Sequence, residues 1–312
     1  MGEAKRIVVV GSANMDVVLP VGRLPRAGET ILGGDLALFP GGKGANQACA
    51  AGKLGGAVWL IAQVGRDAFG TALVSSLQQA GVETEHVGVS GRPTGCACIY
   101  VLPEGENSIV VSPGANATLD PESALSRLAA VKDAGFVLSQ LETPLDTVEA
   151  VFTAARSRGA TTILDPAPAR ELPQSLLRSA DFLTPNQSEA ATLLGNPSWV
   201  IRDFADAAEA ASRLLALGPS AVVMKLGALG CLVCSHHGSE RAEGFQVPAV
   251  DTTAAGDAFN GAFAVALAEG RSVAEAAAFA NASAAISVTR PGAQASLARR
   301  EEVVEFLRRA GA

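Results

Sequence analysis

The sequence has few aromatic residues, few charged residues and no run of basic side chains. Only 4% of its 312 residues are aromatic and 18% are charged, against about 25% charged in an average soluble protein. The net charge is −7, which argues against a nucleic-acid groove or an anionic membrane surface as the partner. Hydrophobic residues make up 48% of the chain, and this excludes a disordered or collagen-like protein.

Long apolar runs and a framework of cysteines are also missing. No uninterrupted apolar stretch reaches the roughly 18 residues of a membrane span, and the segment before Gly11 lacks the apolar core of a signal peptide. The five cysteines are odd in number and irregularly spaced, which predicts reduced thiols. We therefore expect a cytoplasmic protein that has no membrane partner.

One cluster superficially resembles a zinc site, because Cys231 and Cys234 are followed by His236 and His237. A zinc site with this cysteine spacing has a second ligand pair further along the chain, and no convincing pair follows here. The cysteines also lie on an alternating strand that ends before a turn at Gly238. The sequence therefore predicts no metal site in this segment.

Apolar β-branched runs alternate with amphipathic stretches, which is typical of a mostly parallel sheet with helices on both faces. At about 150 residues per domain the length allows two domains or one large α/β domain, and we expect a single domain over residues 1–312. Strands are predicted at 7–10, 57–62, 135–141, 161–164, 182–183 and 221–226. Helices are predicted at 44–54, 68–80, 144–158 (with Thr143 as N-cap), 187–194, 204–217, from near Gly256, after a capping box at Ser272, and at 301–309.

Two segments interrupt this alternation, at about 13–40 and 93–112. They show short strands and turns rich in glycine and proline. If they are inserted near the carboxyl ends of sheet strands, where α/β proteins bind ligands, they form a small sheet that covers a crevice as a lid. Both faces of the strand around Cys98 are apolar, so the second face could equally be a dimer contact.

The most informative run is DTTAAGDAFNG at 251–261. Apolar residues behind it recur at helical spacing, so a helix starts near Gly256. The small residues Ala254, Ala255 and Gly256 leave backbone N–H groups approachable, and with the helix dipole they form an anion site. Asp257 stands where a general base for a hydroxyl belongs, beside a transferred phosphate. The alternative is that Asp257 only caps the helix.

A second run, GGKGANQA at 41–48, also opens a helix with small residues. It is not the phosphate loop G-x-x-x-x-G-K-[ST], and no G-x-G-x-x-G follows the first strand, which excludes a dinucleotide dehydrogenase. Its glycines let a polar ligand touch the backbone, and Asn46 offers both a donor and an acceptor; the alternative is a tight loop with an exposed lysine. Asp16 adds a carboxylate just past the first strand, with an Asx-type turn as its alternative.

These two runs, about 210 residues apart, resemble the two signatures of the ribokinase (PfkB-type) carbohydrate kinase family. Further segments match in family order over essentially the whole chain, at 11–16, 114–117, 140–142, 165–169, 184–186, 227–230 and 289–294. The resemblance implies a three-layer α/β/α ribokinase-like fold with a mostly parallel central sheet and a small β-sheet lid. It also implies ATP-dependent phosphorylation of D-ribose at its 5-hydroxyl, and a homodimer formed through the lid.

The resemblance assigns a role to each matching residue. Asp257 is the catalytic base, and the anion hole is formed by Ala254, Ala255 and Gly256. The implied sugar-binding residues are Asn14, Asp16, Gly42, Lys43, Asn46, Glu142 and Asp257. The implied nucleotide side, where Mg²⁺ binds with ATP, has Asn186, Glu189, Lys225, Gly227, Gly230, Gly256 and Asn281. An activating monovalent cation, K⁺, is implied at Asp251, Thr253, Ser287, Arg290, Gly292 and Ser296.

Four residues depart from the family pattern. Lys225 stands where a small hydroxyl residue is expected, and Asp165 where asparagine is often found. Ala258 follows the base where threonine or serine is common, and Pro291 lies inside the cation loop. Two alternatives stay open: a related kinase for deoxyribose, another sugar or a nucleoside, and a non-catalytic sugar-binding regulator on a kinase scaffold. The regulator is expected to lack the base or the small residues before it, and both are present.

Overall fold

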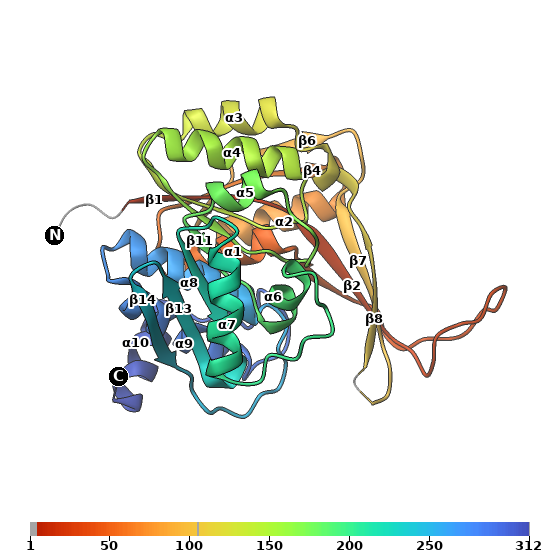
Figure 1. Cartoon of the computed structure of the whole chain (residues 1–312). Coiled ribbons are helices and arrows are strands. Elements are labelled where there is room, and N and C mark those ends of the chain that lie inside the picture. Colours follow the sequence, from red (N-terminus) through yellow and green to blue (C-terminus); the bar gives the residue numbers. More distant parts are fainter. Residues whose placement is uncertain (1–4, 105, 312) are drawn as a thin grey trace.

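The computed structural model describes residues 5–104 and 106–311 (Figure 1). Residues 1–4 belong to the segment in which no signal peptide is predicted, and they lie outside the described residues, as does residue 105 of the second predicted lid segment. In the part of the chain that the structure describes, no helix has the length and apolar character needed to cross a membrane.

The larger sheet has ten strands among the described residues, in the order β14-β13-β12-β11-β10-β9-β1-β4-β5, with β6 also paired to β4. Neighbours from β12 to β5 run parallel, whereas β13 and β14 are antiparallel at one edge. The strands are β1 (Arg6–Val10), β4 (Val58–Gly65), β5 (Val82–Glu83), β6 (Val87–Ser90), β9 (Ala134–Ser139), β10 (Thr161–Leu164), β11 (Phe182–Leu183), β12 (Ala221–Lys225), β13 (Gly230–Ser235) and β14 (Gly238–Glu243).

Helices cover both faces of this sheet, because the central strands are apolar on both sides. Ile7 and Val9 join one buried cluster and Val8 and Val10 the other, as expected when successive side chains point to opposite faces. The first cluster packs against α1 (Lys43–Lys53), α2 (Ala68–Gln79), α8 (Ala255–Ala268), α9 (Val273–Ser287) and α10 (Arg300–Ala310). The second packs against α3 (Pro121–Ala130), α4 (Leu145–Ser157), α5 (Gln174–Ser179), α6 (Gln187–Leu193) and α7 (Phe204–Leu215). The predicted three-layer α/β/α fold is confirmed.

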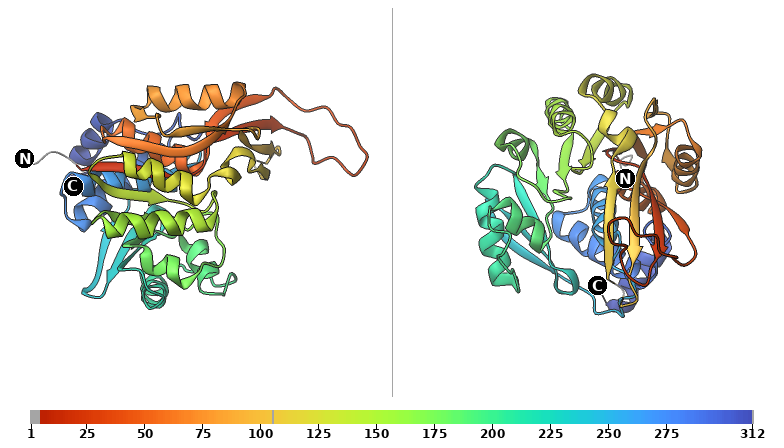
Figure 2. Two further views of the ribbon diagram at one scale, coloured as in Figure 1. Left: turned by 90° about the horizontal axis from the view of Figure 1, so that it is seen from above. Right: turned by 90° about the vertical axis from the view of Figure 1, so that its right-hand side faces the viewer.

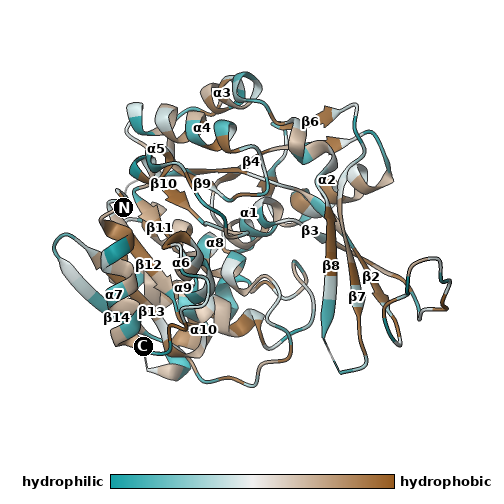
Figure 3. Cartoon of the chain, turned by 45° about the vertical axis from the view of Figure 1, so that its right-hand side comes forward, coloured by the Kyte–Doolittle hydropathy of each residue, from teal (hydrophilic) through white to brown (hydrophobic). Residues whose placement is uncertain are grey.

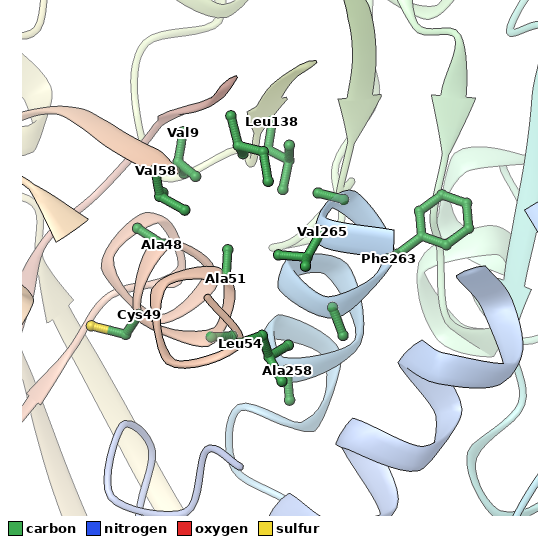
Figure 4. Packing of buried hydrophobic residues seen from close by; sticks show 14 of the residues in the cluster. Val9, Ala48, Cys49, Ala51, Leu54, Val58, Leu138, Ala258, Phe263 and Val265 are labelled. Carbon is green, nitrogen blue, oxygen red and sulfur yellow. The ribbon is translucent and has the colours of Figure 1, made fainter. Parts of the chain in front are cut away.

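Small side chains let α1 and α8 approach closely. Ala51 lies on the side of α1 that faces α8 in the core shown in Figure 4. A Cβ atom added to Gly261 would lie 2.6 Å from the Cβ of Ala50, a distance that no side chain tolerates, so glycine is required there. This packing brings the first turns of the two helices together at the carboxyl edge of the sheet.

A separate four-stranded sheet has the order β3-β2-β7-β8. Its strands are β2 (Asn14–Pro20), β3 (Ala37–Gly41), β7 (Gly95–Val101) and β8 (Asn107–Ser112). They come from the two segments predicted to form the lid. The chain between β2 and β3 projects away from the rest of the molecule, as Figure 1 and the left view of Figure 2 show.

Most predicted elements are present within two or three residues of their expected bounds. Within these limits, the N-cap of α4 is Pro144 rather than the predicted Thr143. The predicted strand at 135–141 is also too long, because β9 ends at Ser139. The chain therefore leaves the sheet two residues early, and Gln140 and Glu142 reach the region beyond the strand ends. Helix α3 was not predicted, although Asp120 caps it and Pro121 opens it.

Candidate active site

The predicted site residues gather where the parallel strands end. Asp16 lies on β2, which follows β1 after three residues, and Glu142 follows β9. Asp165 comes directly after β10, and Lys225 is the last residue of β12. This is the edge at which α/β proteins bind ligands. Helices α1 and α8 also begin here, so their first turns lie close to these side chains.

The first turn of α8 has no side-chain cap. Its N-cap, Ala254, has φ of 59°, in the left-handed region that a residue with a Cβ rarely adopts. The N–H of Ala255 donates to the carbonyl of Thr252 at 3.2 Å. The N–H of Ala255 is therefore already used, whereas that of Gly256 has no backbone acceptor among the described residues. This N–H and the positive end of the helix dipole suit an anion.

The carboxylate of Asp257 does not cap α8; it is held by amides from α1. Asn46 Nδ2 donates to Asp257 Oδ2 at 3.0 Å, and Gln47 Nε2 donates to Oδ1 at 3.1 Å. Burial raises the pKa of Asp257 to about 6, with a further contribution from the charge of Asp165, while Lys43 and the two amide hydrogen bonds oppose the shift. A carboxylate that titrates near neutral pH and is fixed by two donors is suited to general-base catalysis.

Asn46 also provides an unsatisfied acceptor next to the base. Its side chain is buried, its Nδ2 is bound to Asp257, and its Oδ1 has no hydrogen-bond partner among the described residues. A buried amide oxygen without a partner is costly. A ligand hydroxyl that donates to Oδ1 would remove this cost, and it would lie beside Asp257.

Glu142 organises the side of the site next to the small sheet. Its Oε2 accepts from the hydroxyl of Ser12, from the N–H of Lys43 at 3.1 Å and from Asn14 Nδ2 at 3.5 Å. Burial raises the pKa of Asp16 to about 7, and the charges of Glu142 and Asp257 add to the effect while Lys43 opposes it. The Cβ of any larger residue at Gly41 would lie 2.2 Å from Asp16 Oδ2, so glycine leaves room for this carboxylate.

Lys43 supplies positive charge to this group of carboxylates. Burial lowers its pKa, but the charges of Asp257, Asp165, Glu142 and Glu189 outweigh burial and the net pKa is raised. The amine is therefore cationic at neutral pH and lies within electrostatic reach of both the predicted sugar side and the predicted nucleotide side.

Asn116, from the GANA segment, orients Asn14. Its Nδ2 donates to Asn14 Oδ1 at 2.7 Å, and its Oδ1 accepts from the N–H of Ala13 at 2.9 Å. The amide of Asn14 is thereby held with Nδ2 toward Glu142. The segment at 114–117 matches the family pattern, but no role was predicted for Asn116, because nothing in the local sequence shows which side chain it contacts.

Asp165, Lys225 and Gln47 form a connected group that the sequence analysis did not predict. Lys225 Nζ lies 2.9 Å from Asp165 Oδ1, and Gln47 Nε2 donates to Asp165 Oδ2 at 2.8 Å. Gln140 Nε2 in turn donates to Gln47 Oε1 at 2.6 Å. Gln47 therefore joins Asp165 to Asp257, the predicted base, and all the polar side-chain atoms of Gln47 are used.

Asn186 and Glu189 form a capping box at the start of α6. Asn186 Oδ1 accepts from the N–H of Glu189 at 2.9 Å, and Glu189 Oε2 accepts from the N–H of Asn186 at 2.7 Å. Burial raises the pKa of Glu189, opposed by Lys225 and reinforced by Asp165. A carboxylate oxygen suits Mg²⁺, and Glu189 fits it better than Asp165 does, because both oxygens of Asp165 are already bound to side chains.

The remaining predicted nucleotide residues meet at the end of the β13–β14 hairpin. Gly227 and Gly230 have φ of 58° and 96°, and a Cβ on Gly230 would lie 2.2 Å from the carbonyl oxygen of Ala242. Asn281 Nδ2 donates to that same carbonyl at 3.0 Å and to that of Glu243 at 3.2 Å. Asn281 thus ties α9 to β14, beside the loop that contains the two glycines.

The predicted cation residues bring two segments together through Asp251. Its Oδ1 accepts from the N–H of Thr253 at 2.9 Å and its Oδ2 from the N–H of Gly292 at 2.8 Å. The hydroxyls of Ser287 and Ser296 donate to carbonyls three residues earlier, which leaves their oxygens free as acceptors. The guanidinium of Arg290 pairs with Glu302, so only its carbonyl can face a cation. Carbonyl and hydroxyl oxygens fit a poorly hydrated monovalent cation.

Comparison with known proteins agrees with this geometry. The model of the pfkB family of carbohydrate kinases matches residues 4–300. The ribokinase of Haemophilus influenzae is 42% identical over 307 residues, which cover 98% of this chain and 99% of the relative. The ribokinase of Bacillus subtilis is 42% identical over 304 residues, 97% of this chain and 99% of the relative.

Solved structures give the same result. A ribokinase from Thermotoga maritima superposes with a TM-score of 0.87 at 39% identity, covering 97% of this chain and 99% of the other. Arabidopsis thaliana ribokinase complexed with ribose and ATP superposes with a TM-score of 0.89 at 34% identity, covering 98% and 99%.

Proposed function

The chain belongs to the pfkB family of carbohydrate kinases, and we propose that it transfers the γ-phosphate of ATP to the 5-hydroxyl of D-ribose. The observation that carries the proposal is the position of Asp257, fixed by Asn46 and Gln47 beside the N-terminus of α8. Near-full-length identity of 42% to two ribokinases supports ribose as the acceptor. The Arabidopsis complex with ribose and ATP supports the same pair of ligands.

Asp257 accepts the proton of the attacking hydroxyl. A base with a pKa of about 6 is ionised at neutral pH and still has useful proton affinity. The N–H of Gly256, in the first turn of α8, would face the phosphate and, with the helix dipole, stabilise the charge that develops on its oxygens. Mg²⁺ bound with ATP near Glu189 would neutralise part of the negative charge of the phosphates.

The sugar binds between α1 and the small sheet. Asp16 and Glu142 accept hydrogen bonds from the sugar hydroxyls, and Asn14 and Asn46 provide amides. Lys43 balances the charge of the carboxylates, and the backbone at Gly42 is approachable. Such a mixed set suits a polyol, because each sugar hydroxyl both donates and accepts. A ligand hydroxyl would also satisfy the unpartnered Oδ1 of Asn46.

A monovalent cation, K⁺, is proposed behind the anion hole. Asp251 already joins the segments at 251–253 and 290–292. A cation held there by Thr253, Ser287, Gly292 and Ser296 would keep the N–H groups of α8 in their productive orientation.

The four-stranded sheet is proposed to be the lid of one kinase domain that spans residues 1–312, because Asn14 and Asp16 reach the site from β2 of this sheet. Its strands β2, β7 and β8 are strongly hydrophobic (Figure 3). Its exposed apolar side chains support a homodimer formed through the lid: Leu38, Phe39, Ile109, Val110 and Val111. The five free cysteines agree with a cytoplasmic location.

The test is ADP release by purified protein with MgATP and one acceptor at a time: ribose, deoxyribose, fructose or adenosine. Each acceptor is offered with K⁺ and with Na⁺ in its place. We expect the highest kcat/KM with ribose in K⁺. Preference for another acceptor would replace the substrate and retain the mechanism. No turnover from folded protein that still binds ribose would favour the non-catalytic sugar-binding regulator.

A further inference from the structure

Lys225 is a buried lysine at the end of a strand, paired with a buried aspartate. Its backbone N–H donates to the carbonyl of Pro185 at 2.8 Å, which fixes its place beside β11. Its side chain is 11% exposed and that of Asp165 is 3% exposed, and the two groups are 2.9 Å apart. Both charges have lost most of their hydration, so neither is stable in this place without the other.

The amine of Lys225 lies against the first turn of α8. A Cβ built on Gly256 would be 3.4 Å from Lys225 Nζ. The N-terminus of a helix carries partial positive charge and repels a cation. Lys225 therefore occupies a position that is unfavourable until an anion arrives, and Asp165 keeps it there.

Asp165 has no freedom to move away. Its Oδ1 binds Lys225, and its Oδ2 accepts from Gln47 Nε2 at 2.8 Å. The same Nε2 donates to Asp257 at 3.1 Å. Gln47 thus fixes the position of Asp165, the partner of Lys225, relative to Asp257.

We propose that Lys225 is a catalytic residue whose ammonium contacts the transferred γ-phosphate, and that Asp165 is the residue that positions it. The inference rests on the proposed kinase function and adds to it a second source of positive charge at the anion hole. Lys225 and Asp165 carry opposite charges, so the pair adds no net charge to the site. Its cation lies against the first turn of α8, where the phosphate is proposed to bind.

The alternative is that the ion pair has only a structural role. Two variants distinguish this structural role from the proposed contact with the phosphate. Lys225→Met removes the cation with little loss of volume but leaves Asp165 buried and unpaired. Asp165→Asn with Lys225→Met removes both charges, so no buried charge is left alone. Lys132→Met, an exposed lysine on the loop before β9, is the control for loss of a lysine.

We expect kcat with ribose to fall about 100-fold or more in Lys225→Met and to stay at least about tenfold low in the double variant. Binding of a non-hydrolysable ATP analogue, measured by calorimetry, should weaken in the double variant by a larger factor than binding of ADP. Only a contact with the γ-phosphate distinguishes the two nucleotides in this way. ADP binding and melting temperature report whether each variant is folded.

Recovery of wild-type kcat and wild-type nucleotide affinities in the double variant would overturn the proposal and leave the pair a structural one. So would equal weakening of the analogue and of ADP. A wild-type protein that phosphorylates none of the four acceptors would instead overturn the proposed function. The two failures are therefore distinguishable.

Discussion

Asn46 Nδ2 lies 3.0 Å from Asp257 Oδ2, although the two residues are 211 positions apart. The bond joins the first turn of α1 to the first turn of α8, so the two glycine-rich runs of the sequence form one site. One N–H of Asn46 Nδ2 is bound to Asp257, and Oδ1 of Asn46 has no hydrogen-bond partner among the described residues. A ligand hydroxyl that donates to Oδ1 would therefore lie beside Asp257, the proposed base.

Replacing the base tests the central step. Asp257→Asn keeps the size of the side chain but removes its proton affinity, and we expect kcat with ribose to fall about 10³-fold. ADP release measures the rate, and circular dichroism checks the fold. Turnover within threefold of wild type from a folded variant would exclude Asp257 as the base.

The same variant should be more stable than wild type at pH 8. The pKa of Asp257 is about 6 in the folded protein against 3.8 for a free side chain, so between pH 4 and 6 the folded state binds more protons than the unfolded state. Its contribution to stability is present below pH 4 and is lost as pH rises through 6. At about 1.4 kcal/mol per tenfold change in proton affinity, ionising Asp257 costs about 3 kcal/mol above pH 6.

Urea unfolding of wild type and Asp257→Asn at pH 4.5 and pH 8 measures this effect. We expect the free energy of unfolding of the variant, relative to wild type, to be higher at pH 8 than at pH 4.5. An equal difference at both pH values would contradict the raised pKa of Asp257.

Asp16 should control the pH dependence of ribose use. Its pKa of about 7 means that acid removes a hydroxyl acceptor from the sugar site before it protonates Asp257. We expect kcat/KM for ribose to fall as pH drops below 7 and to fall more steeply below 6. In Asp16→Asn the KM for ribose should rise, and the acidic limb should move to about pH 6. An unchanged pH profile in the variant would show that Asp16 does not titrate in this range.

Asp251 should govern the response to potassium. Asp251→Ala removes the acceptor of two backbone N–H groups and separates the segments that it joins. We expect kcat in K⁺ to fall about tenfold and the difference between K⁺ and Na⁺ to disappear. Glu122→Ala, an exposed acidic residue on α3, is the control. A variant that keeps the full K⁺ response would place the cation elsewhere.

The exposed apolar residues of β8 should hold the dimer together. Val110 is 64% exposed, and Val110→Glu places a charge at the centre of that surface. We expect light scattering to give a dimer for wild type and a monomer for the variant. Val200, 69% exposed on a loop outside the small sheet, gives the control Val200→Glu. A wild-type protein that is monomeric at all concentrations would refute dimerisation through the lid.

The sequence predicted the elements that depend on local pattern. Apolar runs such as Ile7–Val10 specify buried parallel strands, and Ser272 with Glu275 forms the capping box expected from their spacing. The four-stranded sheet has its strands in the segments where the alternation of strands and helices is interrupted. The roles of the site residues stay predictions, but the two motifs that contain most of them do meet at one edge of the sheet.

By itself, then, the sequence determined the layers, the edge at which the site lies and the helix start that offers its N–H groups, because each depends on periodicity or on residues close in the chain. Only the tertiary structure decided that Gln47 joins Asp165 to Asp257, and that Lys225 lies against Gly256. Gln47 lies 118 positions from Asp165 and 210 from Asp257, and Lys225 lies 31 positions before Gly256. These contacts depend on how closely α1 packs on α8 and where β10 and β12 end, which no local pattern encodes.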